Sequence, residues 1–348
     1  YNPQAPLSID ENEYADLVKF WIENRGNYEG RVNGANYGIY AQDHARYFDQ
    51  TRGEGHAVRA NLFYTGMAAA GIEFKDYTYL STADTIWHHI RDKQMYITGG
   101  VGAEAADEAY GADYDLPNDG YCETCAQVAM GFLSENLSRA FGGSEYQDVL
   151  ERYLYEGALG CVGENGKTFY YQQPLSNVNN ARWNWLEHTP CCPPMFLKFY
   201  SELPSYIYSY DDSSVYLNQF ISSQMVLDNG LTVTQTTDMP WGGTSKVTVT
   251  GGSTILRVRI PNWVGEDAVS IQKNSTAYDY TVENGYALVK VSDGETVEIQ
   301  LPMKARRVYS NEQIEANQGK VSLAYGPLVY SFEQDDNAFI PRFGSGEG

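Results

Sequence analysis

Basic side chains are scarce in this sequence. Lysine and arginine together number 24 against 45 aspartates and glutamates, which gives a formal net charge of -21. Nucleic acids and anionic membrane surfaces are bound through basic patches, so this balance argues against both as partners. A polyanionic polysaccharide is repelled for the same reason, and an uncharged ligand such as a neutral sugar suits the chain better.

Long hydrophobic runs are also missing. No stretch of about 18 apolar residues occurs, which argues against a membrane-spanning helix. A chain of 348 residues with 43% hydrophobic content is long enough for two domains with a sizeable core. We therefore expect a soluble protein, and the Asn-x-Ser/Thr sequons at Asn136 and Asn274 favour a secreted or periplasmic location.

Cysteine is sparse and odd in number. The chain has five cysteines: Cys122, Cys125, Cys161, Cys191 and Cys192. An odd count, concentrated in two short motifs, argues against a disulfide framework, and adjacent cysteines do not readily bridge each other. Metal binding or catalysis is the better interpretation of the two motifs.

Helical periodicity dominates residues 1–205, the first predicted domain. A capping box at Ser8 and Glu11 and the apolar stripe after it predict a first helix that ends near Gly26. About six helices are expected in all on periodicity. The later ones run from near His56 to Gly71, around Trp87, from near Cys125 to Gly142, from a Ser144–Gln147 capping box through Ala158, and from Pro193 onward.

The pattern changes near residue 206, where the second predicted domain begins. Short β-rich segments separated by Asp-Asn-Gly and Gly-Gly turns predict a β-sandwich over residues 206–348. The expected strands are residues 206–210, 215–220, 231–236, 246–250, 255–260, 287–291, 297–301 and 321–329. One further short strand, residues 168–171, is expected within the helical domain.

Two cysteine motifs carry the clearest chemistry: Cys-Glu-Thr-Cys at residues 122–125 and Cys-Cys-Pro-Pro at residues 191–194. Thiolates and a carboxylate are ligands that zinc accepts in a tetrahedral shell. Glu123 and Cys125 diverge by roughly 200° on a regular helix, so they share one ion only at a helix start or in a loop. Cys191 and Cys192 precede a proline-initiated helix, whose free N–H groups stabilise a thiolate.

An acidic segment, residues 107–119, lies just upstream and holds five carboxylates. Three interpretations stay open from the residues alone: a solvated loop, a calcium loop that lacks the terminal Glu of an EF-hand, or a segment that presents a general acid to the thiols. Among the histidines, His44 and His56 sit at predicted loop-to-helix junctions and are candidate pocket residues. The His88-His89 pair is interpreted as structural.

These motifs and others in the same order resemble glycoside hydrolase family 127, the β-L-arabinofuranosidases, and the related family 146. The matching landmarks are Tyr-Ala-Gln-Asp-His at 40–44, Gly-His-Ala-Val-Arg-Ala at 55–60, Met-Tyr-Ile-Thr-Gly-Gly at 95–100, Glu-Ala-Tyr-Gly at 108–111, Asp-Tyr-Asp-Leu-Pro-Asn-Asp at 113–119, Glu-Thr-Cys-Ala at 123–126, the Cys-Cys-Pro-Pro motif, and Tyr-Gly-Pro-Leu-Val-Tyr at 325–330. They extend over most of the chain.

The resemblance implies an (α/α)6 toroid followed by β-sandwich structure. A full toroid has twelve helices in this family, so the helical region of this chain is expected to be its C-terminal half, with the missing half or a second copy of the chain as a partner. The resemblance also implies one zinc ion. Its ligands, matched by motif, are Glu123, Cys125, Cys191 and Cys192.

The implied activity is retaining hydrolysis that releases β-L-arabinofuranose from an oligosaccharide or glycoconjugate. The motif positions make Cys191 the nucleophile and Glu108 the acid/base, while His56 and Tyr171 match positions that contact the sugar. We add His44 as a substrate-binding candidate. Two alternatives are kept: a glycosidase of the same family that acts on another pentose or a pyranose, and a non-catalytic, zinc-stabilised carbohydrate-binding protein. A third hypothesis is that the chain is an inactive piece of the enzyme.

Overall fold

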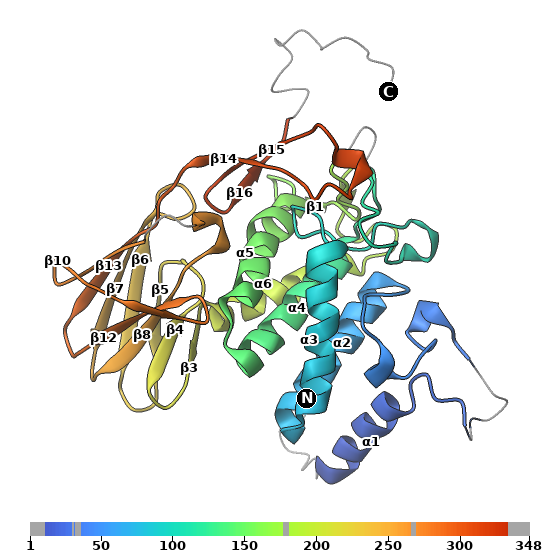
Figure 1. The fold of residues 1–348 in the computed structure, drawn as a ribbon, viewed down its shortest axis with the longest axis horizontal. Coiled ribbons are helices and arrows are strands. Elements are labelled where there is room, and N and C mark those ends of the chain that lie inside the picture. Colours follow the sequence, from blue (N-terminus) through green and yellow to red (C-terminus); the bar gives the residue numbers. More distant parts are fainter. Residues whose placement is uncertain (1–10, 30, 32–35, 177–180, 266–268, 333–348) are drawn as a thin grey trace, which may run out of the picture.

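A helical region and a β-rich region lie side by side in the computed structural model (Figure 1). The structure describes residues 11–29, 31, 36–176, 181–265 and 269–332. The helical region comes first in the chain and the β-rich region follows it, as the sequence predicts. Among the described residues, no helix combines the length and the apolar character that a membrane span requires.

The helical region is built around one central helix, α4. Its small and apolar side chains are buried on most sides, and it packs against α2, α3, α5 and α6. The helices are α1 Glu11–Glu23, α2 Ala57–Phe74, α3 Tyr77–Lys93, α4 Thr124–Phe141, α5 Ser144–Arg152, the π-helical η5 Tyr153–Leu159 and α6 Cys192–Ile207. Short 3-10 turns are η2 Ile39–Ala41, η3 Tyr47–Asp49 and η4 Ala106–Glu108, and the strands β1 Thr168–Phe169 and β2 Trp183–Asn184 pair with each other.

Two helix boundaries differ from the prediction, and a third cannot be compared. The Ser144–Gln147 capping box is wrong, because Gly143 is the N-cap and the Gln147 amide donates instead to Glu135 and Ser138. The strand predicted from residue 206 starts two residues later, because α6 continues through Ile207. Ser8 of the first capping box lies outside the described residues.

Two sheets of the β-rich region share one hydrophobic core. The six-stranded sheet has the order β10-β9-β13-β7-β6-β5 and the five-stranded sheet the order β11-β12-β8-β4-β3. Alternate residues of β7, such as Val247 and Val249, point inward and meet Val258 and Val289 of the other sheet in the same core. The strands are β3 Tyr208–Tyr210, β4 Ser214–Leu217, β5 Ser223–Val226, β6 Thr232–Thr237, β7 Thr244–Thr250, β8 Thr254–Arg259, β9 Ser270–Lys273, β10 Thr276–Ala277, β11 Thr281–Glu283, β12 Tyr286–Val291 and β13 Thr296–Gln300; the 3-10 turn η6 Asn262–Val264 follows β8.

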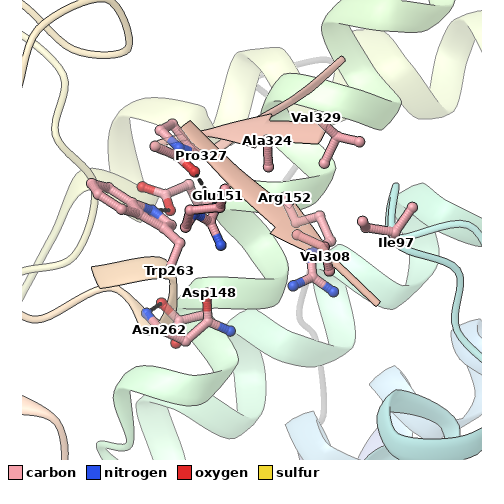
Figure 2. A pocket seen from close by; sticks show the side chains of 12 residues that line it. Ile97, Asp148, Glu151, Arg152, Asn262, Trp263, Val308, Ala324, Pro327 and Val329 are labelled. Atoms are coloured by element: carbon pink, nitrogen blue, oxygen red, sulfur yellow. Dashed lines mark hydrogen bonds between the residues drawn. The ribbon is translucent and has the colours of Figure 1, made fainter. Parts of the chain in front are cut away.

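A third sheet lies over the helical region, away from the two larger sheets (Figure 1). It contains β14 Ala305–Val308, β15 Ser322–Tyr325 and β16 Leu328–Tyr330, and the 3-10 turn η7 Glu315–Asn317 lies between its first two strands. The single strand predicted at residues 321–329 is therefore wrong, because the chain reverses at Gly326, where φ is 55°. Figure 2 shows this sheet facing Arg152, and the Val329 amide donates to the carboxylate of Glu156 over 2.7 Å.

A buried ion cluster joins the two regions. Arg259, at the end of β8, is 0% exposed, and its guanidinium pairs with Asp148 over 2.6 Å and with Glu151 of the same helix α5. The indole N–H of Trp263 also donates to Glu151 over 2.9 Å. We call Asp148, Glu151 and Arg259 the Arg259 cluster. It holds the helical region against the five-stranded sheet.

Candidate active site

The starts of two helices meet at the candidate site. Glu123 is the N-cap of α4 with an extended backbone (φ -64°, ψ 137°), so its side chain turns back beside Cys125 in the first turn. Cys191 is the N-cap of α6 and Cys192 its first residue, with prolines following in the first turn. The convergence of Glu123 and Cys125 at a helix start is the arrangement that their spacing predicts.

The four side chains form one compact group, here called the thiol cluster. The Cys125 sulfur lies 3.4 Å from the Cys191 sulfur and 3.2 Å from the Cys192 sulfur, and Cys191 and Cys192 are 3.9 Å apart. Oε1 of Glu123 lies 3.5 Å from Cys191 and 3.8 Å from Cys192. All the cysteines are free thiols, and the four ligand atoms lie within 4.8 Å of one another, so they are able to hold a metal ion.

The thiol cluster has no cationic side chain of its own. In the part of the chain that the structure describes, no lysine or arginine forms an ion pair with Glu123. Burial, and then the neighbouring Cys191, raise the pKa of Glu123 to about 8. Hydrogen bonds from Cys125 and Cys192 lower the pKa of Cys191, so it is the thiol that most readily loses its proton. Oε2 of Glu123 is buried without a hydrogen-bond partner.

A second carboxyl group faces Glu123. His56, Glu108 and Glu123 lie within 4.8 Å of one another, and Nε2 of His56 is 3.0 Å from Oε2 of Glu108. His56 caps α2, where its Nδ1 accepts the Arg59 amide, so the ring proton is on Nε2 and is donated to Glu108. Burial lowers the pKa of His56, which keeps the ring neutral.

The backbone that carries Glu108 is strained. Asp107 and Glu108 both have positive φ, at 55° and 52°, a region that side chains with a Cβ rarely occupy. The turn is closed by paired hydrogen bonds between Glu104 and Ala109, and Ala109 forms a β-bridge with His56. Such strain persists only where the surroundings impose it, and here it aims the Glu108 side chain toward Glu123.

Aromatic side chains line the remaining wall. The Tyr171 hydroxyl is 3.6 Å from the Cys191 sulfur, and the Tyr171 ring stacks on Trp183 at 4.7 Å. The prediction missed Trp183 and also Tyr121, whose pKa is raised by burial and then by its hydrogen bond to Glu108. An isolated Tyr or Trp carries no spacing signal, although the position of Tyr121 beside the 122–125 motif pointed toward the site.

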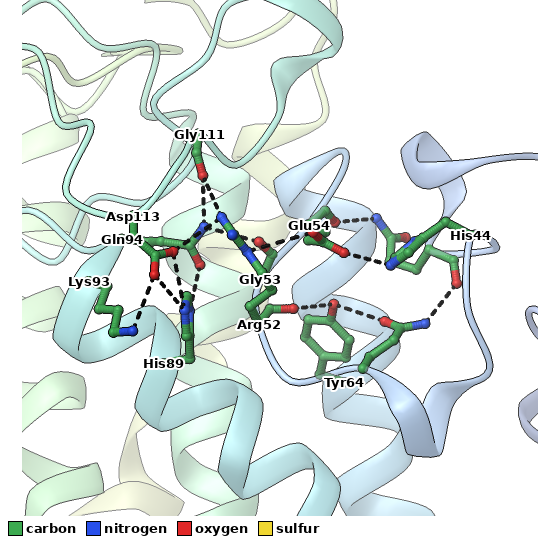
Figure 3. Close-up of polar contacts among 12 residues, drawn as sticks. His44, Arg52, Gly53, Glu54, Tyr64, His89, Lys93, Gln94, Gly111 and Asp113 are labelled. Carbon is green, nitrogen blue, oxygen red and sulfur yellow. Dashed lines mark hydrogen bonds and ion pairs between the residues drawn. The ribbon is translucent and has the colours of Figure 1, made fainter.

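The structure places His44 in a separate network, shown in Figure 3. Its Nε2 pairs with Glu54 over 2.6 Å, and no contact among the described residues joins it to Cys191 or Glu108. The acidic segment divides in two: Glu108 faces the thiol cluster, whereas Asp113 pairs with Arg52, His89 and Lys93. The predicted structural role of His89 agrees with this placement.

Comparison with known proteins identifies the family. The model described as "Beta-L-arabinofuranosidase, GH127 catalytic domain" matches residues 7–205, which contain every residue of the site. The chain belongs to glycoside hydrolase family 127. The middle-domain model of that family matches residues 214–303 and the family's C-terminal domain model matches residues 305–345, so the third sheet corresponds to a separate family unit.

Relatives in family 127 extend well beyond this chain. A curated non-reducing end β-L-arabinofuranosidase of Bifidobacterium longum subsp. longum is 33% identical over 311 residues, covering 83% of this chain and 47% of that protein. A solved family 127 β-arabinofuranosidase superposes with a TM-score of 0.87 at 34% identity, covering 94% of this chain and 54% of its own. The β-L-arabinofuranosidase of Geobacillus stearothermophilus T6 gives 0.87 at 30% identity, covering 94% of this chain and 57% of its own. The chain thus spans about half the length of these relatives.

Proposed function

We propose that this chain carries the catalytic residues of a retaining glycoside hydrolase that releases β-L-arabinofuranose from arabinofuranosides. The observation that carries the proposal is that Glu123 lies next to both the cysteines and the His56–Glu108 pair. It belongs to the thiol cluster and also lies within 4.8 Å of His56 and Glu108, so one site holds a reactive thiol and a carboxyl group. A non-catalytic zinc-binding protein has no need of the second carboxyl group, which counts against that alternative.

Zinc is the proposed metal, held by Glu123, Cys125, Cys191 and Cys192. Tetrahedral zinc with Zn–S bonds of about 2.3 Å separates its sulfur ligands by about 3.8 Å. The sulfur distances of 3.2–3.9 Å fit this spacing. Bound zinc stabilises the thiolate form of Cys191 at neutral pH.

The proposed reaction proceeds in two displacements. Cys191 attacks the anomeric carbon and forms a thioglycosyl intermediate, while Glu108 protonates the departing oxygen. Glu108 then takes a proton from water, which hydrolyses the thioglycosyl bond and returns the sugar with its original anomeric configuration. His56 holds the Glu108 carboxyl group through its Nε2–H, and the Tyr171 hydroxyl lies beside the Cys191 sulfur, where it is proposed to contact the sugar.

We further propose that residues 1–205 belong to an (α/α)6 toroid and residues 206–348 to β-sandwich structure. Six α-helices among the described residues and the common core of the two large sheets support this. The substrate is proposed to be an arabinose-containing glycan, and the location to be secreted or periplasmic. A sugar-contacting role for His44 stays a prediction.

The test is hydrolysis of a series of β-L-arabinofuranosides with graded leaving groups by the zinc-loaded protein, compared with Glu108→Gln. We expect wild-type turnover and a loss in the variant of about 10²–10⁴-fold for poor leaving groups, because they depend on the general acid. The variant Glu104→Gln, in the same turn, is the matched control and should retain activity. Hydrolysis of pyranosides alone, or an equal loss for all leaving groups, would contradict the proposal.

A further inference from the structure

One buried amide joins the two loops that carry His56 and Glu108. Gln94 is 2% exposed at the C-cap of α3, and its Nε2 donates to the carbonyl of Gly53 over 3.0 Å and to that of Gly111 over 2.9 Å. Gly53 is three residues before His56, and Gly111 is three residues after Glu108. We infer that Gln94 is a positioning residue that sets the separation of His56 and Glu108 by holding these two loops together.

The amide orientation is fixed by its surroundings. Nε2 of Gln94 faces two carbonyl oxygens, which accept only, and Oε1 faces Nδ1 of His89 at 3.2 Å. Every donor and acceptor of the amide is therefore engaged in a buried place, where an unmade hydrogen bond is costly. Figure 3 shows Gln94 at the centre of this network, between Gly53 and Gly111.

The loops touch again nearer to the site, so displacement at Gln94 is passed on. The Tyr110 amide donates to the Gly55 carbonyl over 2.9 Å, and Ala109 bridges to His56. Gly55 has a φ of 68° and has no room for a Cβ, which would lie 1.9 Å from the Ile39 carbonyl. The short, strained segments on both sides leave few ways to relax other than moving Glu108 relative to His56.

A second tie is weaker and is partly exposed. Arg52 donates to the Gly111 carbonyl over 3.2 Å and pairs with Asp113 over 3.2 Å, with its side chain 34% exposed. Arg52 directly precedes Gly53, so this tie also joins the two loops, but its side chain is partly exposed, whereas the two hydrogen bonds of the Gln94 amide are buried. Substitution of Gln94 is therefore expected to reduce kcat more than substitution of Arg52.

This inference rests on the proposed function, because Glu108 matters as the group that protonates the leaving oxygen. A shift of about 1 Å in a catalytic group reduces a rate on the order of 10²-fold. Gln94→Met keeps the length of the side chain and removes its donors. We expect kcat to fall about 10–100-fold for a poor leaving group, about threefold or less for a good one, and KM to change little, because Cys191 and Tyr171 are untouched.

Gln235→Met is the matched control. Gln235 in β6 is also buried, at 1% exposure, and its Nε2 donates to two carbonyls, those of Gln219 and Ile221, in the β-rich region. Each variant loses two hydrogen bonds from a side-chain amide to backbone carbonyls, so the two should be destabilised alike. Only Gln94→Met should change how kcat depends on the leaving group. Equal losses for all leaving groups, or the same kinetics in both variants, would overturn the inference.

Hydrogen exchange separates this inference from the proposed function. In Gln94→Met, but not in Gln235→Met, amide exchange of residues 109–113 should become at least several-fold faster, since the Tyr110–Gly55 bond loses its support. A wild-type protein that hydrolyses no arabinofuranoside defeats the proposed function. Unchanged exchange in residues 109–113 defeats the positioning role of Gln94, whatever the substrate is.

Discussion

The Arg259 cluster and the thiol cluster are both buried and polar, but they differ in how charge is balanced within them. The Arg259 cluster sets two carboxylates against a guanidinium of the same chain, with side-chain exposures of 0–7%. Burial still raises the pKa of Asp148 to about 6, against the opposing effect of Arg259. Each partner is satisfied within the protein, so this cluster needs nothing from outside.

Within the part of the chain that the structure describes, the thiol cluster has no such cationic partner. Three thiols and Glu123 meet at two helix starts, and only one of them, Cys191, has a lowered pKa. Buried anions without a counter-charge are costly, so the group is stable either protonated or around a bound cation. The comparison teaches that a cluster paired within the chain serves architecture, whereas a cluster without a counter-charge is able to hold a metal ion. Their loss should therefore have opposite effects on activity and stability.

The largest expected effect is on activity. Cys191→Ser should reduce hydrolysis of p-nitrophenyl β-L-arabinofuranoside on the order of 10⁴-fold or more, because a serine without an activating base is a poor nucleophile. Cys161→Ser is the control, since Cys161 is equally a free thiol, is buried, and donates only to Ala158. Residual activity of Cys191→Ser within tenfold of the control would show that the nucleophile lies elsewhere.

The next effect is on stability. Arg259→Met leaves Asp148 and Glu151 buried without their counter-charge and should lower the free energy of unfolding by about 3–5 kcal/mol. Arg257→Met removes the pair with Glu283, which is 57% exposed, and should cost no more than about 1 kcal/mol. Urea titrations of the two variants and the wild type measure both values. Equal stability of the two variants would break the comparison.

The two clusters differ in how far they could be predicted from the sequence. The thiol cluster was predictable because its members come in two short motifs, each at a helix start, where side chains of neighbouring residues converge. The Arg259 cluster was not, because Arg259 lies 111 residues from Asp148 and a single arginine in a strand pattern has no distinguishing spacing. Pairings that depend on how two regions dock are set by packing, which a local pattern does not contain.

The fold shows the same division. Helices with a clear apolar period, such as α2 and α4, were predicted within a few residues, and so were most strands of the two large sheets. The strands β5, β9, β10 and β11 were not predicted. The hairpin of β15 and β16 was missed because the turn signal of Gly326-Pro327, inside an otherwise β-rich run, was not used to divide the strand. Gln94 was missed because its importance comes from two carbonyls on loops far apart in the chain.

Metal removal should also distinguish the two clusters, with a smaller change in the free energy of unfolding. With free zinc at about 100 times its dissociation constant, the bound ion adds about 2.7 kcal/mol to the free energy of unfolding. A chelator should remove this increment, and zinc but not magnesium should restore it, because thiolates favour the softer ion. Cys125→Ala should abolish the zinc effect, whereas Arg259→Met should retain it despite its lower stability. Elemental analysis should first establish that the chelator has removed the zinc. If the unfolding midpoint of that protein equals the midpoint of the zinc-loaded protein, the prediction is contradicted.

The smallest expected effect concerns Glu156, which is intermediate between the carboxylates paired with Arg259 and the unpaired Glu123. Its carboxylate accepts the Val329 amide of the third sheet and lies near Arg152, but it forms no ion pair within 4 Å among the described residues. Burial raises the pKa of Glu156 to about 7 from its ordinary value of 4.5. Because the folded pKa is the higher one, the stabilising contribution is fully present below about pH 4.5 and is lost as the pH rises through about 7.

The comparison of wild type with Glu156→Gln isolates this contribution. Relative to the variant, the wild type should lose on the order of 1–3 kcal/mol of unfolding free energy between pH 4.5 and 7.5, since one pKa unit is worth about 1.4 kcal/mol and partial exposure reduces the total. Glu164→Gln changes an exposed residue of the same region and should show no such difference. Urea titrations at the two pH values measure it, and subtracting the variant cancels groups that titrate in both proteins. A wild type that gains stability relative to Glu156→Gln as the pH rises would contradict this prediction and would mean that the charge of Arg152 outweighs the burial of this carboxylate.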